Sequence, residues 1–281
     1  MNLSYLKRPL AAILGSTFLP LTSYAWNATG HMIVADIAYQ NLTSAARAKV
    51  DNLVGQLNQE YPDMKLYANI AYWPDSIRSQ RIETFTHWHY IDNAFTNDGS
   101  ELKNLVDTDN AVWAVNTIQQ VVENNSANVF DRARFLSFLT HIVGDLHQPL
   151  HTASLISATH QNGDKGGNSY FIRYNNDKIN LHKLWDSGVG AFNDTTVEKA
   201  ASLANRISAT YPKAYFGDRV KVVKPDEWAK EGMEVAKQSA YNTPENQYPR
   251  DEYFSNGKKV AEQQVALAGY RLAELLNQLL T

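Results

Sequence analysis

Histidine and aspartate recur at helical spacing in two stretches of this sequence. His141 and Asp145 lie four residues apart in an amphipathic stretch, and His182 and Asp186 repeat that spacing further along the chain. Residues four apart project from one face of a helix, and a buried carboxylate without a partner costs free energy. A divalent cation bound by both side chains removes that cost, and imidazole together with carboxylate suits zinc.

Further candidate ligands lie outside these two pairs. His151 follows the proline that ends the first of the two helices, and His31 and His89 lie closer to the N-terminus. A single histidine beside an apolar face is usually a buried structural residue, and a His–Asp pair is often a plain hydrogen-bonded pair. The number of such residues therefore favours a metal site more than any one of them does.

The sequence alone does not decide the roles of four other residues. Asp75 alone would be interpreted as a helix N-cap, and His87 and His160 are assigned to the surface or the core because they have no partner at ligand spacing. For His147 two interpretations stand, a residue that supports a metal ligand or a structural histidine.

The first 25 residues have the three parts of a secretory signal peptide. A short basic start precedes an apolar stretch over roughly residues 9–21, and small residues, Ser23 and Ala25, occupy the two positions that a signal peptidase reads. The apolar stretch is too short to span a bilayer comfortably. We therefore expect cleavage between Ala25 and Trp26 and a secreted or periplasmic protein, and we expect no transmembrane segment and no membrane partner.

The charge and composition of the mature chain exclude several classes of site. The whole sequence has 26 basic and 29 acidic residues, and removal of Lys7 and Arg8 leaves 24 against 29 in 281 − 25 = 256 residues, a net charge of −5. No basic patch favours nucleic-acid binding, although composition does not count bound metal. The absence of cysteine excludes disulfides and thiolate metal sites.

Helical periodicity predicts a mainly α, single-domain, multi-helix fold. A β-prone segment at residues 169–174, followed by a turn cluster at 175–177, adds one small β-hairpin. Proline-containing segments at 223–225 and 242–249 are interpreted as surface connections. The expected helices are one around Ile33–Ile37, one capped by Thr43, and those at Ala111–Val122, Arg134–His147, Thr195–Ile207 and Val260–Leu280.

Several ordered motifs resemble the zinc-dependent, single-strand-specific nucleases of fungi and plants. The motifs follow the family order from residue 26 to about 190, whereas the last 90 or so residues match only as helices. The matching stretches are Trp26-Asn27-Ala28-Thr29-Gly30-His31, Trp73-Pro74-Asp75-Ser76-Ile77-Arg78, His89-Tyr90-Ile91-Asp92, the eleven residues from His141 to His151, Gly166-Gly167-Asn168, and Leu181-His182-Lys183-Leu184-Trp185-Asp186.

The resemblance implies three zinc ions in one cleft. Carried over by position, the first ion takes Asp75, His89, His141 and Asp145. The second takes His151, His182 and Asp186. The third takes His31, Asp145 and Trp26, the last through its backbone amine and carbonyl oxygen. A free α-amine has a pKa near 8 and can bind zinc, whereas a peptide nitrogen cannot, so leader removal would complete this site.

The same resemblance implies a reaction and a substrate. A hydroxide shared by two zinc ions would attack phosphorus, with Asp75 and Asp145 in the catalytic centre and Arg78 stabilising charge on the phosphoryl oxygens. Tyr90, Asp92 and Asn168 take the places of substrate-binding residues. We expect hydrolysis of single-stranded RNA and DNA to 5′-nucleotides, removal of 3′-phosphates from nucleotides, and a monomeric enzyme.

Two alternatives remain open from the sequence. One is a zinc-dependent phospholipase C of the same three-zinc superfamily, whose last ligand is typically glutamate where this chain has Asp186. The other is an exported protein that binds zinc without catalysis. The chain departs from the fungal and plant pattern in having no disulfide, so its stability would rest more on the core and on bound metal.

Overall fold

The computed structural model describes residues 26–193 and 196–281, and it confirms the mainly α class. The proposed leader and position 195, the expected start of one helix, lie outside these residues. The elements are α1 (Ala28–Gln40), α2 (Ser44–Glu60), α3 (Tyr67–Ile70), α4 (Trp73–Ser79), η1 (Thr86–His89), β1 (Ala94–Thr96), α5 (Ala111–Glu123), α6 (Val129–Asp145), η2 (Pro149–His151), β2 (Ser154–Ile156), β3 (Phe171–Tyr174), β4 (Asp177–Asn180), α7 (Leu181–Asp186), α8 (Val197–Thr210), α9 (Lys213–Phe216), η3 (Gly217–Lys221), α10 (Pro225–Val235), η4 (Ala236–Ala240) and α11 (Asp251–Leu279).

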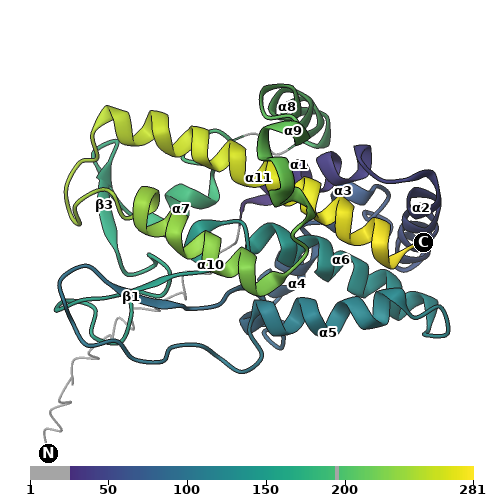
Figure 1. Cartoon of the computed structure of the whole chain (residues 1–281), viewed down its shortest axis with the longest axis horizontal. Coiled ribbons are helices and arrows are strands. Elements are labelled where there is room, and N and C mark those ends of the chain that lie inside the picture. Colours follow the sequence, from purple (N-terminus) through teal and green to yellow (C-terminus); the bar gives the residue numbers. More distant parts are fainter. Residues whose placement is uncertain (1–25, 194–195) are drawn as a thin grey trace, which may run out of the picture.

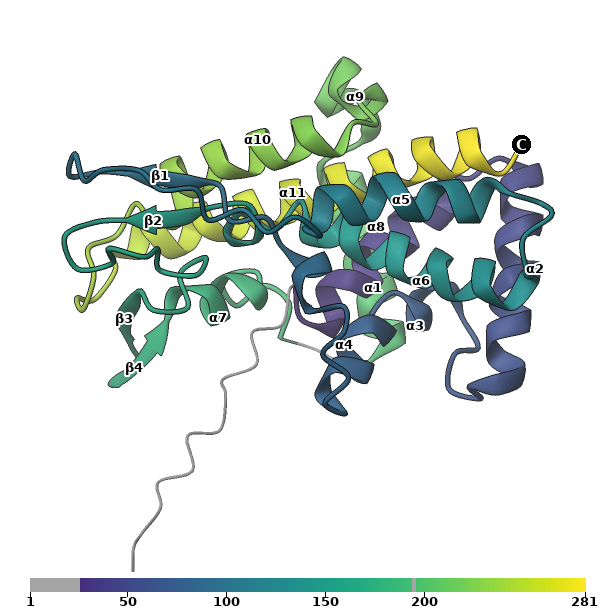
Figure 2. The ribbon, with the colours of Figure 1, turned by 90° about the horizontal axis from the view of Figure 1, so that it is seen from below.

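The long helix α11 runs along the molecule and organises the helical core. Figures 1 and 2 show the short strands gathered at one end of the molecule and α2 at the other. Helix α1 packs against both α11 and α8, while α5 packs against α6. The contacts between these helices bury a large apolar cluster, and a smaller cluster that includes Leu155, Ile172 and Trp185 lies among the strands and α7.

Most of the helices expected from periodicity are present, and local caps fix where they begin. Thr43 caps α2 as predicted, because its hydroxyl accepts a hydrogen bond from the backbone N–H of Ala46. Helix α6 begins at Val129, five residues before the expected start, since the side chain of Asn128 accepts hydrogen bonds from the first turn. Helix α11 begins nine residues early, at Asp251, in a polar segment that gives a weak apolar signal.

The predicted β-hairpin is present with a shorter turn. Strands β3 and β4 pair antiparallel, and the turn consists of Asn175 and Asn176, both with positive φ. The assignment of Asp177 to the turn was wrong, because it pairs with Tyr174. A second pair, β1 with β2, is parallel and was not predicted, since strands of three residues have too little alternation to be recognised.

One proline-containing segment was interpreted wrongly as a connection. Pro225 is the first residue of α10 rather than part of a loop. Proline suits this position because the first N–H of a helix has no intrahelical partner and the ring presets φ. Helix α10 continues into the π-helical turn η4, which ends at Ala240 and is followed by its C-cap residue, Tyr241.

Among the described residues, no helix is both long and apolar enough to cross a bilayer. The candidate site lies where α1, α4 and α6 converge, with η2 and α7 adjoining it.

The close approach of α1 and α11 gives a test of this packing. A Cβ at Gly269 would lie 2.6 Å from the Cβ of Ile37, so Gly269→Ala should lower the free energy of unfolding by about 1–3 kcal/mol in urea titrations. Gly55 in α2 has open space around it, so Gly55→Ala should raise stability by about 0.5–1 kcal/mol. Equal stabilisation by both variants would contradict the packing of α1 on α11.

Candidate metal centre

Two buried helices bring the first candidate ligands together. His141 and Asp145 lie on the last turns of α6, and His31 on α1 stacks against His141 with ring centroids 3.8 Å apart. His31 Nε2 is 3.3 Å from Asp145 Oδ1. Gly144 makes room for this arrangement, because a Cβ there would lie 2.9 Å from Nδ1 of His31.

Helix α4 and the 3₁₀ turn η1 add an aspartate and a histidine. The Nδ1 atom of His89 is 3.1 Å from Asp145 Oδ2 and 3.7 Å from Asp75 Oδ1. Asp75 Oδ1 is also 3.6 Å from His141 Nε2. The interpretation of Asp75 as an N-cap was wrong, because Tyr72 is the N-cap of α4. Asp75 lies in the first turn of the helix, and its side chain lies close to His89 and His141. Four elements that are distant in sequence thus meet around Asp145.

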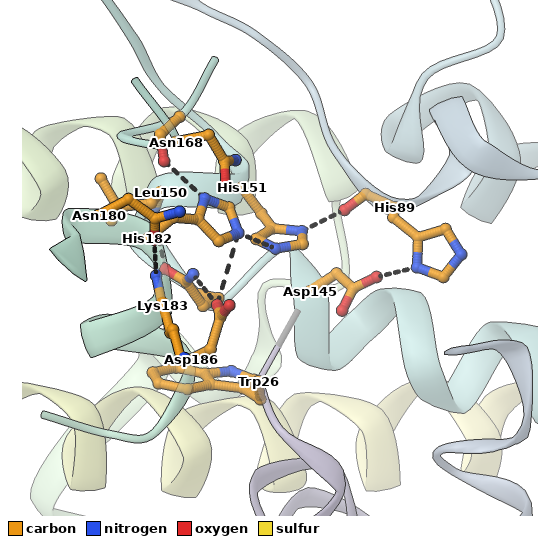
Figure 3. A network of polar contacts seen from close by, with 12 residues as sticks. Trp26, His89, Asp145, Leu150, His151, Asn168, Asn180, His182, Lys183 and Asp186 are labelled. Carbon is orange, nitrogen blue, oxygen red and sulfur yellow. Dashed lines mark hydrogen bonds and ion pairs between the residues drawn. The ribbon is translucent and has the colours of Figure 1, made fainter. Parts of the chain in front are cut away.

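A second group of ligand atoms lies beside the first. His151 Nε2 is 3.0 Å from His182 Nε2, and His182 Nε2 is 3.5 Å from Asp186 Oδ1. Figure 3 shows His151 and His182 facing each other, with Asp145 close to their group. Within the described residues, ligand atoms lie within 4.8 Å of one another in three sets, namely His31–Asp75–His141, His89–His141–Asp145 and His151–His182–Asp186.

Backbone carbonyls orient three of the imidazole rings. Nδ1 of His141 donates to the carbonyl of Ala71 (2.7 Å), and Nδ1 of His151 donates to that of His89 (2.6 Å). Nδ1 of His182 donates to the carbonyl of Gly166 (2.5 Å). A hydrogen bond from one ring nitrogen fixes the tautomer, so Nε2 of each ring presents its lone pair to the shared space.

Several buried polar atoms in this space have no hydrogen-bond partner. They include both ring nitrogens of His31 and one oxygen each of Asp75 and Asp145. Buried polar groups are almost always paired, so this concentration of unpaired polar atoms in one place suits a bound cation. Neutral imidazoles and carboxylates, with no thiolate, are a donor set that zinc accepts. The residues therefore fit a metal ion.

Burial sets the protonation of the metal-free centre. Burial lowers the pKa of His31, His89, His141 and His151, with that of His141 falling to about 3, so these four rings are neutral and able to coordinate a metal ion. Burial raises the pKa of Asp75 to about 7 and those of Asp145 and Asp186 well above the usual carboxyl range. A proton and a cation therefore compete for the same carboxylates.

Arg78 lies close enough to act on this centre electrostatically. It is three residues after Asp75, in the last turn of α4. Its positive charge opposes the rise in pKa of Asp75 and adds to the fall in that of His89. The same charge acts on Asp145, His151 and Asp186. Its placement suits a group that faces an anionic substrate.

The buried indole ring of Trp26 fixes the chain next to the centre. Its Nε1 donates to the carbonyl of Gly144 (3.0 Å), and the ring packs edge-on against Phe192. The backbone N–H of Asn27 donates to the carbonyl of Asp186 (2.8 Å). These contacts hold the chain at residue 26 beside two candidate ligands, Asp186 and Asp145, the residue that follows Gly144. Figure 3 shows Trp26 beside Asp186.

The three candidate substrate-binding residues lie on segments that flank the centre. Tyr90 and Asp92 directly follow His89, and the backbone N–H between them, that of Ile91, donates to the carbonyl of His151. Burial raises the pKa of Asp92 to about 7, with a further contribution from Asp164. Burial and the charge of Asp92 raise that of Tyr90 to about 12.

Asn168 lies on the adjoining loop, partly exposed, and its amide donates to the carbonyl of Lys165 (2.8 Å). The charge of Lys165 also acts on Asp92. The loop of Asn168 and the segment after His89 are therefore neighbours.

The remaining histidines lie away from the ligand set. His147 points toward α11, where its Nε2 accepts from the buried Arg271 (3.1 Å), so it is a structural residue rather than a support for a ligand. His87 pairs at the surface with Asp109. His160 pairs with Glu245.

Sequence reasoning missed the supporting role of Gln148 and assigned none to Gly166. Gln148 Nε2 donates to Asp186 Oδ1 (2.7 Å), and its Oε1 accepts from the backbone of Leu150. The carbonyl of Gly166 orients His182. Backbone carbonyls leave no signal in a sequence, whereas the consecutive glycines at 166 and 167 do indicate an unusual loop.

Comparison with known proteins decides between the alternatives that the sequence left open. The family model described as S1/P1 nuclease matches residues 26–281. The chain belongs to the S1/P1 nuclease family. It is accordingly a nuclease, a hydrolase whose substrate is nucleic acid, and the phospholipase C alternative is set aside. The match begins at Trp26 and extends through the C-terminal helices, beyond the last recognised motif near residue 190.

Individual relatives cover nearly the whole chain. Nuclease S1 of Aspergillus oryzae is 26% identical over 91% of this chain and 92% of its own length. Endonuclease 5 of Arabidopsis thaliana is 29% identical over 96% of this chain and 95% of its own length. Nuclease P1 of Penicillium citrinum is 25% identical over 90% of this chain and 97% of its own length.

The raised carboxyl pKa values predict that zinc uptake releases protons below neutral pH. With a pKa of about 7 in the metal-free protein, Asp75 is mostly protonated at pH 6 and mostly ionised at pH 8. Zinc should therefore displace more protons at pH 6, and its apparent affinity should fall by about tenfold per pH unit for each proton displaced. Calorimetric titration in buffers of different ionisation enthalpy measures this number. Proton release that is absent at pH 6 would contradict the assignment.

Proposed function

We propose that this nuclease holds three zinc ions and hydrolyses single-stranded RNA and DNA to 5′-nucleotides, with removal of 3′-phosphates as a second activity. The observation that carries the proposal is the set of buried, unpaired oxygens and nitrogens around Asp145. The ligand sets inferred from the sequence are compatible with the distances: Asp145 lies between His31 on one side and His89 and His141 on the other. The family membership supports the choice of nucleic acid.

The roles of the chain's own groups follow from their placement. Bound zinc supplies positive charge and lowers the pKa of water to near neutral. Asp75 and Asp145 would hold the ions in place, and Asp145 could serve more than one of them because its two oxygens face different histidines. The Arg78 guanidinium matches phosphate in shape and its charge acts on the same centre, so it would stabilise charge on the phosphoryl oxygens.

Recognition of the base is assigned to Tyr90 and Asp92. The aromatic ring of Tyr90 offers a stacking face, and the Asp92 carboxyl offers a hydrogen-bonding edge. A base can reach both only when it is outside a duplex, which gives the preference for single strands. Asn168, on the neighbouring loop, would contact the substrate beside the metal ions.

Trp26 would become the first residue of the mature protein, so the proposal also concerns the localisation of the enzyme and the completion of its metal site. We propose that cleavage after Ala25 releases a secreted or periplasmic enzyme and frees an α-amine that binds one zinc ion. The indole of Trp26 is anchored in the core, so the amine would be delivered at a fixed place beside Asp145 and Asp186. The family match that begins at residue 26 supports this boundary.

Substitution of one ligand tests the enzyme proposal. Asp75→Asn keeps the shape of the side chain but removes a charge, and it should lower the cleavage rate of a single-stranded oligonucleotide by more than about 100-fold. The matched control is Asp63→Asn, at an exposed position outside the centre, which should leave the rate unchanged. The wild type should cleave the single strand far faster than its duplex. Equal rates on both substrates would refute the specificity, and full activity of Asp75→Asn would refute the centre.

Retention of one extra residue tests the role of the amine. A protein that begins at Ala25 differs from the mature form only in moving the amine by one residue, and it should bind one zinc ion fewer and turn over a dinucleotide more slowly. Metal analysis after dialysis measures the first effect, and steady-state kinetics measures the second. Three tightly bound ions and the mature rate in this longer form would exclude coordination by Trp26.

A further inference from the structure

Asp164 is a completely buried carboxylate outside the ligand set. It begins the loop that leads to Gly166 and Asn168. Its Oδ1 accepts from the backbone N–H of Leu155 (2.9 Å), and the hydroxyl of Tyr241 donates to both of its oxygens (3.0 and 2.8 Å). The backbone N–H of Gly167 also donates to it. The contacts with Leu155 and Tyr241 join the loop to other parts of the protein, whereas the contact with Gly167 lies within the loop.

The loop after Asp164 has a backbone conformation that needs external support. Lys165, Gly166 and Gly167 have φ values of 57°, 59° and 79°, three left-handed residues in succession. A left-handed lysine is unfavourable by itself. The neighbouring hydroxyl of Ser154 accepts from the N–H of Lys165 (3.1 Å). The Asp164 contacts therefore compensate for a shape that the chain would not adopt alone.

Tyr241 brings this support from a remote part of the sequence. It lies 77 residues after Asp164, at the end of the π-helical turn η4. Burial raises its pKa well above 10, so the phenol keeps its proton and donates. Local departures into π-helix are frequent at functional sites, and here the turn delivers a hydroxyl to the loop.

The supported loop acts directly on one metal ligand. The carbonyl of Gly166 accepts from Nδ1 of His182 (2.5 Å), and the carbonyl of Gly167 accepts from its backbone N–H (3.4 Å). A Cβ at Gly166 would lie 2.2 Å from the carbonyl oxygen of Leu150. The loop is therefore confined between Leu150 and His182, and a shift of its backbone would move the carbonyl that orients the ring.

We propose that Asp164 and Tyr241 form a positioning pair for His182. The pair fixes the left-handed loop so that the Gly166 carbonyl holds Nδ1–H of His182, and Nε2 faces His151 and Asp186, with which it would hold a zinc ion. This inference rests on the proposed zinc-dependent function. It assigns to the C-terminal part of the chain, which supplies Tyr241 but no candidate ligand, a defined role in metal binding.

The variant Tyr241→Phe tests the pair. It removes one hydroxyl and keeps the ring, so Asp164 loses the donor to both oxygens. We expect one bound zinc ion to be released at about tenfold lower chelator concentration than in the wild type, with the other ions retained. The matched control is Tyr270→Phe, which removes another buried hydroxyl whose bond to the carbonyl of Tyr211 lies between α11 and the end of α8. The control should change the melting temperature without selective zinc loss.

A second variant perturbs the same loop through a different contact, so the inference stays testable if Tyr241→Phe does not fold. Ser154→Ala removes the hydroxyl that accepts from Lys165 and should weaken the same zinc ion to a smaller extent. If Tyr241→Phe and Ser154→Ala both retain every ion as tightly as Tyr270→Phe does, the inference is wrong although the proposed function stands. If the wild type itself binds no zinc and does not cleave single strands, the proposed function fails first.

Discussion

The burial of carboxylates beside neutral imidazoles is the interaction on which the rest of this structure depends. Asp145 is fully buried within hydrogen-bonding distance of His31, His89 and His141, yet one of its oxygens has no partner. Without a cation such a centre must either retain protons on its carboxyls or leave charge unsatisfied, and both cost free energy. The fold concentrates this free-energy cost around Asp145, so a metal ion bound there would contribute both to stability and to chemistry.

Much of this centre was predictable from the sequence because its ligands lie on regular elements. Two His–Asp pairs use helical spacing, and the strong periodicity of α6 placed His141 and Asp145 correctly on one face. The convergence of Asp75, His89 and His31 on that face depends on tertiary structure, which the spacing of residues in the sequence does not predict. Resemblance to a family supplied it, and the distances within the described residues agree with it.

The errors have a common physical origin in short or polar elements. The β1–β2 pair has three residues in each strand, and the early turns of α11 are polar, so neither gives a clear hydrophobic period. Pro225 was interpreted as a break although it begins a helix. None of these errors displaced a candidate ligand, because the ligand-bearing elements are fixed by apolar packing. Helices α1, α4 and α6 belong to the larger apolar cluster, and η2 and α7 belong to the smaller one.

The last third of the chain supplies contacts to the part that contains the candidate ligands. The first two-thirds of the sequence contain every candidate ligand, but Tyr241 and Arg271 reach back from the last third to the loop of Gly166 and to the turn after α6. Metal ligands must be held within a few tenths of an ångström to favour one ion and one geometry. The hydroxyl of Tyr241 provides that rigidity through the loop of Gly166, and this part of the C-terminal region therefore belongs to the site although it coordinates nothing in it.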